Sequence, residues 1–328
     1  MKHAHPHSVT TRQAAELKSR LQAQIHVLTQ LDHGKATRAI IAQWLIIVAT
    51  AAAAIYLHHW AFYLLAIVVI GGRQHALAVL MHEASHFRLY GNRLWNDFVG
   101  DFFLAFPLGV STRLYRHRHL RHHRFTNTEN DPDWRDMAAD EDWIWPKPIF
   151  ASMGLFAADL LGLKSLKAAK IFMTWSPWPR VMRVDDEVDS LTPRERWSLL
   201  GVVAIAIVAI SASGGFWYFF LLWIVPQLTV LSAAFRLRAI AEHLEVEGDL
   251  HPTRHTDASM LERSVIAPLN INYHLAHHFY PSVPFYNLPP LHELLMEQPE
   301  FKEQAHLTGS YTGLRDGVLG ELTRAPTP

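Results

Sequence analysis

The hydrophobic residues of this chain gather in two pairs of long apolar segments. The first pair covers about residues 39–57 and 60–80, and the second covers about residues 199–213 and 216–235. Each segment approaches the ~20 residues that a helix needs to cross the ~30 Å hydrocarbon core of a bilayer. The linkers within the pairs, HHW and SGG, are very short and contain no lysine or arginine. The pattern therefore predicts about four transmembrane helices in two hairpins.

Basic residues flank these segments on one predicted side only. Lys35, Arg113 and Arg236 represent the stretches before, between and after the two pairs. Because lysine and arginine favour cytosolic loops, this distribution predicts that both termini and the central region face the cytosol. The alternative is a soluble helical protein with buried helices. Four long apolar segments in two pairs, with the charge on one side, favour the membrane protein.

Two further apolar stretches fit this layout less directly. Residues 98–110, FVGDFFLAFPLGV, are short and interrupted by Asp101 and Pro107, so we expect a re-entrant or interfacial segment. Residues 145–175 predict an amphipathic helix on the membrane surface. The chain then divides into a polar N-terminal cytosolic segment, a membrane domain and a C-terminal tail, over residues 1–38, 39–300 and 301–328.

Composition narrows the chemistry that is available. The chain has 328 residues, of which 50% are hydrophobic, a formal net charge of zero and no cysteine. Zero net charge gives no electrostatic reason to expect a nucleic acid partner. Without cysteine, disulfides, thiolate ligands and a thiol nucleophile are excluded, so any metal must be held by nitrogen and oxygen. The polar N-terminus predicts no secretory signal, and its HAHPH stretch is expected to be disordered rather than a metal site.

Three clusters among the 22 histidines have a spacing typical of metal ligands. HEASH covers residues 82–86, and H-x-x-H-H occurs twice, at residues 119–123 and 274–278. In a helix, residues three and four apart share one face, so each cluster can aim its imidazoles at one point. At this histidine frequency, two copies of H-x-x-H-H arise by chance in well under about one chain in a hundred. All three clusters fall on the predicted cytosolic side, which favours one shared site over coincidence.

HEASH also fits H-E-x-x-H, the zinc-protease helix in which Glu83 would act as general base. A catalytic zinc ion takes three protein ligands and keeps one open position. The three clusters supply eight histidines, and two metals fit that number better than one zinc ion. Imidazole suits iron, copper, nickel and zinc, so the ligand type alone leaves the metal open.

The three clusters and their flanks resemble the histidine boxes of the membrane fatty acid desaturase superfamily. The matching stretches are HEASH, HLRHHRFTNTENDPDW and NINYHLAHHFYPSVPFYNLPPLH, and the likeness runs from about residue 40 to residue 295. The resemblance implies an all-α integral membrane protein whose cytosolic helical cap holds a di-iron site. It also implies eight iron ligands, which are His82, His86, His119, His122, His123, His274, His277 and His278.

The resemblance extends to positions outside the boxes. His243 matches a ninth histidine that the family often adds after the last span. Asn270 matches a polar position that reaches a metal through water. Glu83, Glu242 and Asp131 lie near these ligands in sequence and are expected to orient imidazoles, although a solvated acidic loop explains Asp131 equally well.

The same two interpretations apply to Asn127, Asn130 and Asp133, which follow the second box. The remaining histidines of interest lie outside the box spacing and are not expected to be ligands. They are His75, His117, His251, His255 and His292.

A nitrogen-rich metal site beside a bilayer predicts oxidation of a lipid. The chain has no nucleophile elbow, glycine-rich phosphate loop or Walker motif, so hydrolysis and nucleotide chemistry lack their parts. Redox-active iron activates dioxygen, and the protein then binds, orients and shields the substrate. An unactivated C–H bond offers no acid–base handle, so its oxidation suits two iron ions. We expect dioxygen-dependent oxidation of an acyl chain that is carried as an acyl lipid or an acyl thioester.

Electrons must come from outside, because the chain has no flavin, haem or iron–sulfur motif, including the His-Pro-Gly-Gly motif of a fused cytochrome b5. The resemblance implies a ferredoxin or cytochrome b5 as the donor. A group of arginines around the second box could attract an acidic donor or lipid headgroups, or could be ordinary positive-inside charge. These arginines are Arg113, Arg116, Arg118, Arg121 and Arg124.

Desaturation and hydroxylation share the first hydrogen abstraction, and their outcome depends on how the chain is placed. The flank FYPSVPFYNLPPLH resembles acyl-lipid desaturases, so we expect a desaturase, with a hydroxylase as the alternative. A non-catalytic metal-binding or transport protein would need ionisable residues within the spans, and the central segments largely lack them. The missing cysteines and bare N-terminus fit a bacterial inner membrane, with the endoplasmic reticulum as the alternative.

Overall fold

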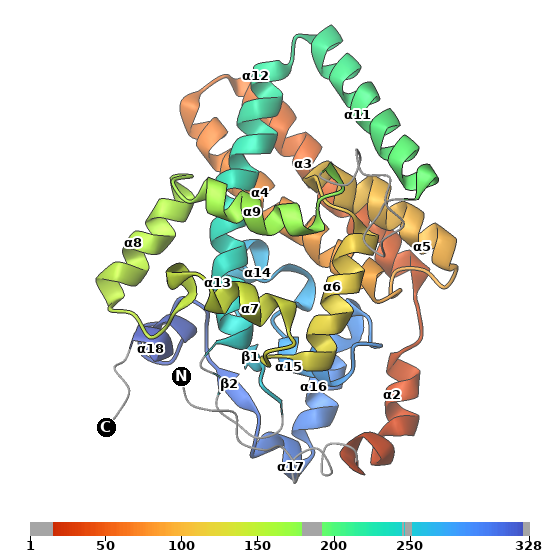
Figure 1. Ribbon diagram of the computed structural model, residues 1–328, viewed down its shortest axis with the longest axis vertical. Helices are drawn as coiled ribbons and strands as arrows, with labels where there is room; N and C mark the ends of the chain where they lie inside the picture. Colours follow the sequence, from red (N-terminus) through yellow and green to blue (C-terminus); the bar gives the residue numbers. More distant parts are fainter. Residues whose placement is uncertain (1–15, 179–191, 245, 247–250, 324–328) are drawn as a thin grey trace. The chain divides into compact units, whose positions relative to one another are not determined.

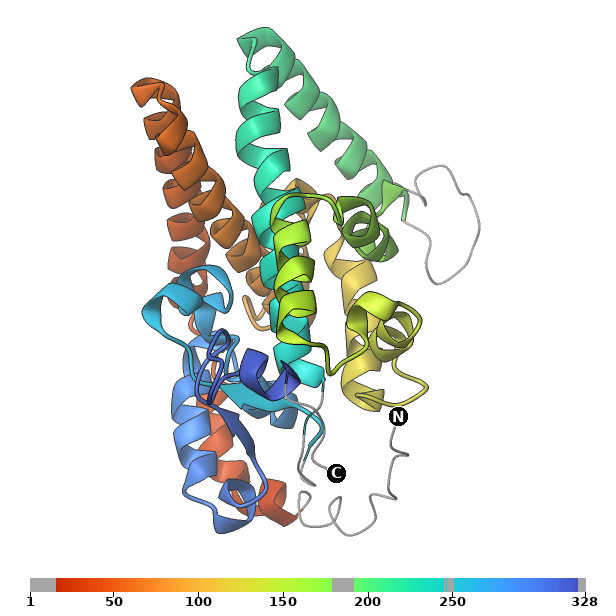
Figure 2. The same ribbon diagram turned by 90° about the vertical axis from the view of Figure 1, so that its left-hand side faces the viewer.

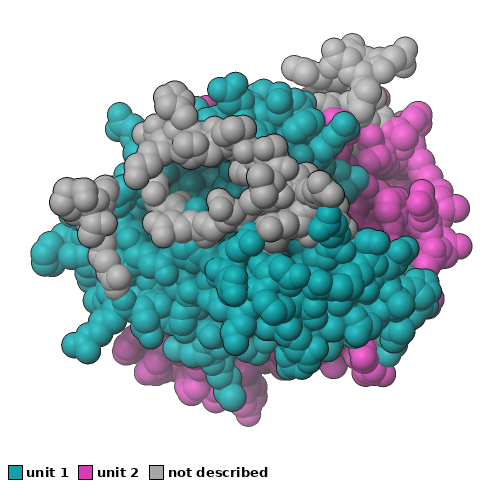
Figure 3. All heavy atoms as spheres, turned by 90° about the horizontal axis from the view of Figure 1, so that it is seen from below, with its two compact units in different colours: residues 1–32, 118–155, 236–328 teal, residues 33–117, 156–235 magenta. Residues whose placement is uncertain are grey.

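The computed structural model is almost entirely helical (Figure 1). It describes residues 16–178, 192–244, 246 and 251–323, so the HAHPH stretch lies outside the described residues. The chain forms two compact units, which are coloured separately in Figure 3. Unit 1 comprises residues 1–32, 118–155 and 236–328, and unit 2 comprises residues 33–117 and 156–235.

Four helices are long and apolar enough to cross a membrane, as the sequence predicts. They are α3 (His33–Leu57), α4 (Trp60–Ser85), α11 (Pro193–Ser213) and the continuous run Phe216–His243. Each helix contains the apolar segment expected from the sequence and continues beyond it, by eight residues at the end of the last run. Polar residues can continue a helix past the hydrocarbon core, so apolar length alone underestimates the helices.

The last of these helices is not a regular α-helix. It consists of four consecutive pieces, which are α12 (Phe216–Phe219), η4 (Phe220–Ile224), η5 (Gln227–Leu231) and α13 (Ser232–His243). Both η4 and η5 are π-helical, and Pro226 lies between them. Proline has no backbone N–H and its ring displaces the preceding carbonyl, so the hydrogen-bond ladder shifts register around it.

Small residues let the long helices of unit 2 approach closely. Helices α3 and α4, joined by two residues, lie side by side (Figures 1 and 2), and Ala54, Ala66 and Ile70 form a buried cluster with Leu222 of η4. An added Cβ on Gly71 would lie only 2.6 Å from the Cβ of Val230 in η5. Packing of this kind replaces the hydrophobic effect between helices in a bilayer. The glycine therefore sets the distance between α4 and η5.

Gly71→Leu is expected to destabilise the protein by at least the ~1–3 kcal/mol that overpacking of a tight interior typically costs. Gly201 in α11 is the matched control, because it is exposed and an added Cβ there would meet no atom within 4 Å. Gly201→Leu should leave stability unchanged or raise it slightly through helix propensity. Thermal unfolding in detergent measures both variants, and equal midpoints would contradict this account of the packing.

Shorter helices complete unit 2. The segment predicted to be re-entrant or interfacial forms α5 (Arg93–Val99), η1 (Gly100–Ala105) and η2 (Phe106–Leu108), and none of these is long enough to span a bilayer. Helix α6 (Thr112–Phe125) follows and contributes residues to both units. Two helices bent by 75° occupy most of residues 145–175, namely α8 (Ile149–Leu160) and α9 (Ser165–Trp175). The break replaces the single helix that the sequence predicted, and length and composition would also allow a broken span or a re-entrant loop. The location at the membrane surface stays a prediction.

Unit 1 departs slightly from the all-α prediction. Strands β1 (Arg254–Thr256) and β2 (His306–Thr308) pair in parallel. The described helices of this unit are α2 (Gln22–Leu28), α7 (Pro132–Ala138), η3 (Glu141–Trp143), α14 (Met260–Val265), η6 (Pro268–Asn270), α15 (His274–Phe279), η7 (Phe285–Asn287), α16 (Leu288–Met296), α17 (Pro299–Lys302) and α18 (Val318–Thr323).

A hydrophobic core supports the helix that carries the third histidine cluster. Leu275 and Phe279 on α15 are buried with Leu291 and Leu295 of α16. The core also includes side chains from the N-terminal segment, which are Leu17, Leu21 and Ile25. Because one face of this short helix packs in the core, its histidines lie on the other face, where they contact other histidines.

Candidate metal centre

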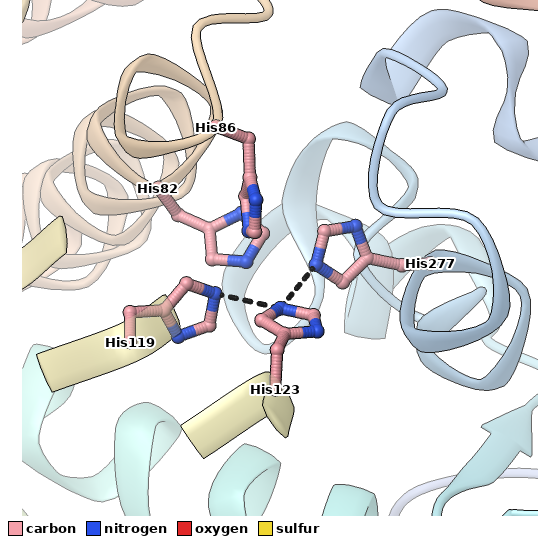
Figure 4. Close-up of side chains that lie close together, drawn as sticks. All are labelled: His82, His86, His119, His123 and His277. Atoms are coloured by element: carbon pink, nitrogen blue, oxygen red, sulfur yellow. Dashed lines mark hydrogen bonds between the residues drawn. The ribbon is translucent and has the colours of Figure 1, made fainter. Parts of the chain in front are cut away.

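One group of histidines in unit 1 joins the second and third clusters. His119 and His123 lie one turn apart on α6, and their Nε2 atoms are 2.9 Å apart. The Nε2 atom of His277 on α15 lies 3.2 Å from that of His123. The ligand atoms of these three side chains are all within 4.8 Å of one another, and Figure 4 shows the three rings turned toward one point.

A second group in unit 1 uses the neighbouring histidines. Potential ligand atoms of His122, His243 and His278 lie within 4.8 Å of one another, and all three residues are buried. The Nε2 atom of His274 lies 3.0 Å from that of His243 at the end of α13. The structure therefore brings His243 into the cluster to which the resemblance assigned it.

Each H-x-x-H-H cluster is divided between the two groups. His123 belongs to the first group and His122 to the second, and His277 and His278 divide in the same way. Adjacent residues on a helix point about 100° apart, so two neighbouring histidines cannot aim at one point. The spacing thus places the histidines of each cluster in two separate groups.

A carboxylate lies beside the Nδ1 atom of two of these rings, those of His122 and His274. Asp131 Oδ2 lies 2.9 Å from His122 Nδ1, and this carboxylate also accepts backbone N–H bonds from Asn127 and Asp133. Burial acts to lower the pKa of His122, but the bond to Asp131 and the charge of Asp133 outweigh it and raise that pKa. A carboxylate on Nδ1 fixes the tautomer and leaves the Nε2 lone pair for a metal.

Glu242 has the corresponding position beside His274. Its Oε1 atom lies 3.4 Å from His274 Nδ1 and accepts a 2.6 Å hydrogen bond from Arg238 Nε. The glutamate is buried, and its pairing with arginine compensates for removing a charge from water. Both carboxylates therefore lie beside an Nδ1 atom, and their orienting role stays a prediction.

The first cluster, HEASH, belongs to unit 2. His82 and His86 occupy the end of α4, and their ring centroids are 4.9 Å apart. His82 is 1% exposed, and Glu83 Oε1 lies 3.5 Å from its Nδ1 atom. Figure 4 draws both rings, and the two offer ligand atoms within 4.8 Å of each other. The helix thus presents this pair as the i, i+4 spacing predicts.

The chemistry of the unit 1 groups fits a metal with a preference for nitrogen. His278 Nε2 and His243 Nδ1 are buried and have no hydrogen-bond partner within the described chain. Burial, with the neighbouring histidines, lowers the pKa of His278 well below its usual value. A neutral imidazole with a free lone pair is the form that binds metal. Unpaired polar atoms at such depth are costly, and a bound cation would satisfy them.

The family model described as fatty acid desaturase matches residues 58–309, which is more than half of the chain. The chain belongs to the fatty acid desaturase family. The dihydrorhizobitoxine desaturase of Bradyrhizobium elkanii is 28% identical over 78% of this chain and 73% of its own length. The sn-1 oleoyl-lipid 12-desaturase of Arthrospira platensis is 27% identical over 64% of this chain and 61% of its length. The chloroplastic omega-6 fatty acid desaturase of Glycine max is 27% identical over 67% of this chain and 53% of its own length.

Membership in the desaturase family confirms the resemblance drawn from the histidine boxes. It makes the protein an oxidoreductase, and the family's dependence on metal agrees with the buried histidine groups. The four long apolar helices agree with a membrane protein. The zinc-protease interpretation of HEASH and the non-catalytic alternative gain no support.

His251 lies beside the second histidine group, a place that the sequence could not predict. The ring centroid of His251 lies 5.1 Å from that of His278, and its Nδ1 atom pairs with the hydroxyl of Thr253. No spacing or motif relates His251 to the boxes, so only the fold reveals its place. Neither group includes His251, and the same holds for His255 and His292, which stack on each other at 4.0 Å.

Several other candidate residues have specific places. The Asn127 amide donates to the carbonyls of His243 and Pro252, so it holds the backbone of α13 rather than an imidazole ring. The Asn270 amide donates to the carbonyl of Phe285, and its role toward a metal stays a prediction. Asp133 lies 3.8 Å from His122 Nδ1 and binds Arg118.

The remaining predictions concern single positions. The carbonyl of Asn130 accepts from Arg121. His75 is fully buried within α4, and His117 is exposed on α6. Neither histidine belongs to a group of possible metal ligands among the described residues.

Three of the five arginines around the second box bind carboxylates. Arg113 pairs with Glu195, Arg116 with Asp97, and Arg118 with both Asp133 and Asp136. Arg121 and Arg124 are exposed. The surface that could attract an acidic protein is therefore smaller than the sequence implies.

Proposed function

We propose that this protein is a dioxygen-dependent di-iron desaturase that introduces a double bond into an acyl chain. The observation that carries this proposal is the division of the second and third histidine boxes into two groups in unit 1, of which the second is fully buried. Two groups of imidazoles in a desaturase-family chain fit two iron ions. Bound iron would supply the oxidising power that dioxygen chemistry on an unactivated C–H bond requires.

The chain's own residues would divide the ligand roles between two sites. His119, His123 and His277 would hold one ion, and the boxes of the family imply that His82 and His86 complete this shell. A second set would hold the other ion, and it consists of His122, His243, His274 and His278. Asp131 and Glu242 would orient His122 and His274 through their Nδ1 atoms. Asn270 is proposed to contact a metal through water. Glu83 is proposed to orient His82.

The proposed setting is a bacterial inner membrane. The four long helices would cross it as two hairpins, with both termini and the histidine-bearing cap in the cytosol, as the distribution of basic residues predicts. An external donor of the ferredoxin or cytochrome b5 type would deliver electrons there. Arg121 and Arg124 are the exposed cations that we propose for attracting it.

The substrate class is an acyl chain carried by a lipid or a thioester. The names of two relatives refer to a fatty acid or an oleoyl lipid and support a lipid substrate. The name of the third relative refers to dihydrorhizobitoxine. The flank of the third box resembles acyl-lipid desaturases, which favours the acyl chain. Hydroxylation by the same centre is the second candidate function.

Expression in a host of known lipid composition, followed by mass spectrometry of lipids and polar metabolites, tests the proposal. We expect new acyl chains that are lighter by two hydrogen atoms, and none in cells that express His123→Ala. An added oxygen atom would indicate the hydroxylase. A change confined to small polar metabolites, or no change with a donor system co-expressed, would contradict an acyl desaturase.

A further inference from the structure

We infer that Arg116 and Arg254 are positioning residues that fix the ends of two membrane helices that carry proposed iron ligands. The helix α4 ends at the pair His82 and His86, and the run Phe216–His243 ends at His243. In each case a guanidinium from elsewhere in the chain binds the last carbonyl groups of the helix. The inference rests on the proposed function, because it takes these histidines as ligands.

Arg116 closes the end of α4 within unit 2. Its Nε atom donates to the carbonyl of Ser85 at 2.8 Å, and its Nη2 atom donates to the carbonyl of Ala84 at 2.9 Å. Asp97 accepts from the same guanidinium and holds it in place, and only 12% of the Arg116 side chain is exposed. The two carbonyls belong to the residues between His82 and His86, so the contact acts on the backbone of the box itself.

The residue after His86 shows that this helix end is constrained. Phe87 has φ of +57°, a left-handed conformation that glycine adopts freely and bulky residues adopt at a cost. The guanidinium of Arg116 lies 3.9 Å from the centroid of the Phe87 ring. One side chain therefore binds both the last carbonyls of the helix and the strained residue that turns the chain away. Strain of this kind persists only where the surroundings impose it.

Arg254 plays the same part at the end of α13 within unit 1. Its Nη1 atom donates to the carbonyl of Ala241 at 3.1 Å, and its Nη2 atom donates to that of Leu244 at 3.3 Å. The arginine comes from β1, its side chain is 0% exposed, and it pairs with Glu321 of α18 at 2.9 Å. His243 lies between the two carbonyls, so its backbone is held on both sides.

The common pattern has a physical reason. The last carbonyls of a helix have no partner within the helix and carry a partial negative charge. A guanidinium presents several donors in one rigid plane, so it can bind two carbonyls and a carboxylate together, which an ammonium group cannot do with fixed geometry. The helix end then cannot fray or rotate, and the imidazoles of its last turn keep the directions that a metal requires.

Metal binding by Arg116→Gln and Arg116→Lys tests the inference at α4, with Arg113→Gln as the matched control. Arg113 lies one turn away on α6, and its Nε atom donates to the carboxylate of Glu195. Full-length protein is titrated with Co²⁺ against a chelator, and its visible absorption reports ligand geometry. We expect both Arg116 variants to bind one of two Co²⁺ ions about tenfold or more weakly, with an altered spectrum and a melting temperature close to that of the control.

Arg254→Lys and Glu321→Gln test the second helix end in the same way, with Arg20→Gln as a control that loses exposed contacts with Glu300 and Gln298. We expect Arg254→Lys to weaken the other Co²⁺ site and to change a different part of the spectrum. Unchanged Co²⁺ affinity at both sites in Arg116→Lys and Arg254→Lys would overturn the inference. So would a loss of Co²⁺ affinity that only follows the loss of thermal stability. A wild-type chain that binds no Co²⁺ or iron would instead overturn the proposed function.

Discussion

Replacement of His277 by alanine should abolish activity and release iron from the purified protein. His277 is fully buried, and its Nε2 atom lies 3.2 Å from that of His123 in the first histidine group. Loss of a ligand should cost more than the about 10–100-fold in metal affinity or activity that loss of an outer partner typically costs. Iron per chain, measured by mass spectrometry of the digested protein, and double-bond formation in membranes are the two readouts.

His255→Ala is the matched control for His277→Ala. His255 is also a buried histidine of unit 1, but it stacks on His292 and lies outside both groups. Its variant should keep the wild-type iron content even if it is less stable. Retained iron and activity in His277→Ala, or equal losses in the two variants, would refute the ligand assignment.

Asp131→Asn should weaken metal binding by about 10–100-fold without unfolding the protein. The carboxylate holds His122 Nδ1 at 2.9 Å and caps α7 by accepting the backbone N–H of Asp133. Asparagine keeps an oxygen for the cap but removes the charge that raises the pKa of His122. The metal affinity of one site, measured by competition with a chelator, should fall while the melting temperature changes little.

Asp133→Asn provides the comparison for Asp131→Asn. Its carboxylate is also near His122, at 3.8 Å from Nδ1, but its short contact is with Arg118. We expect a much smaller change in metal affinity. If the two variants lose affinity equally, the effect comes from general charge near the ring, and the specific bond from Asp131 has no special role.

The sequence was sufficient to predict the four long helices and the family to which the chain belongs. Apolar length locates a membrane helix because the bilayer fixes how many residues it needs, and the i, i+3, i+4 spacing fixes a shared face. Local patterns of this kind depend only on neighbouring residues. They can therefore be recognised without knowledge of the fold.

Features that depend on distant residues could not be predicted in this way. His251 lies against His278 although no motif relates it to the boxes. Arg116 is one of several similar arginines in sequence, and only the fold brings its guanidinium to the carbonyls of Ala84 and Ser85 at the end of α4. The π-helical turns around Pro226 likewise reflect how that helix adapts to its neighbours. Spacing also did not divide the histidines into two groups. That division needed the observed distances between their ligand atoms.

The most direct test of the central claim is anomalous X-ray scattering at the iron edge from crystals of the iron-loaded protein. The two histidine groups predict two iron peaks, one bound by His119, His123 and His277 and the other bound by His122, His243 and His278. A single peak, or peaks bound by other residues, would contradict the two-metal centre.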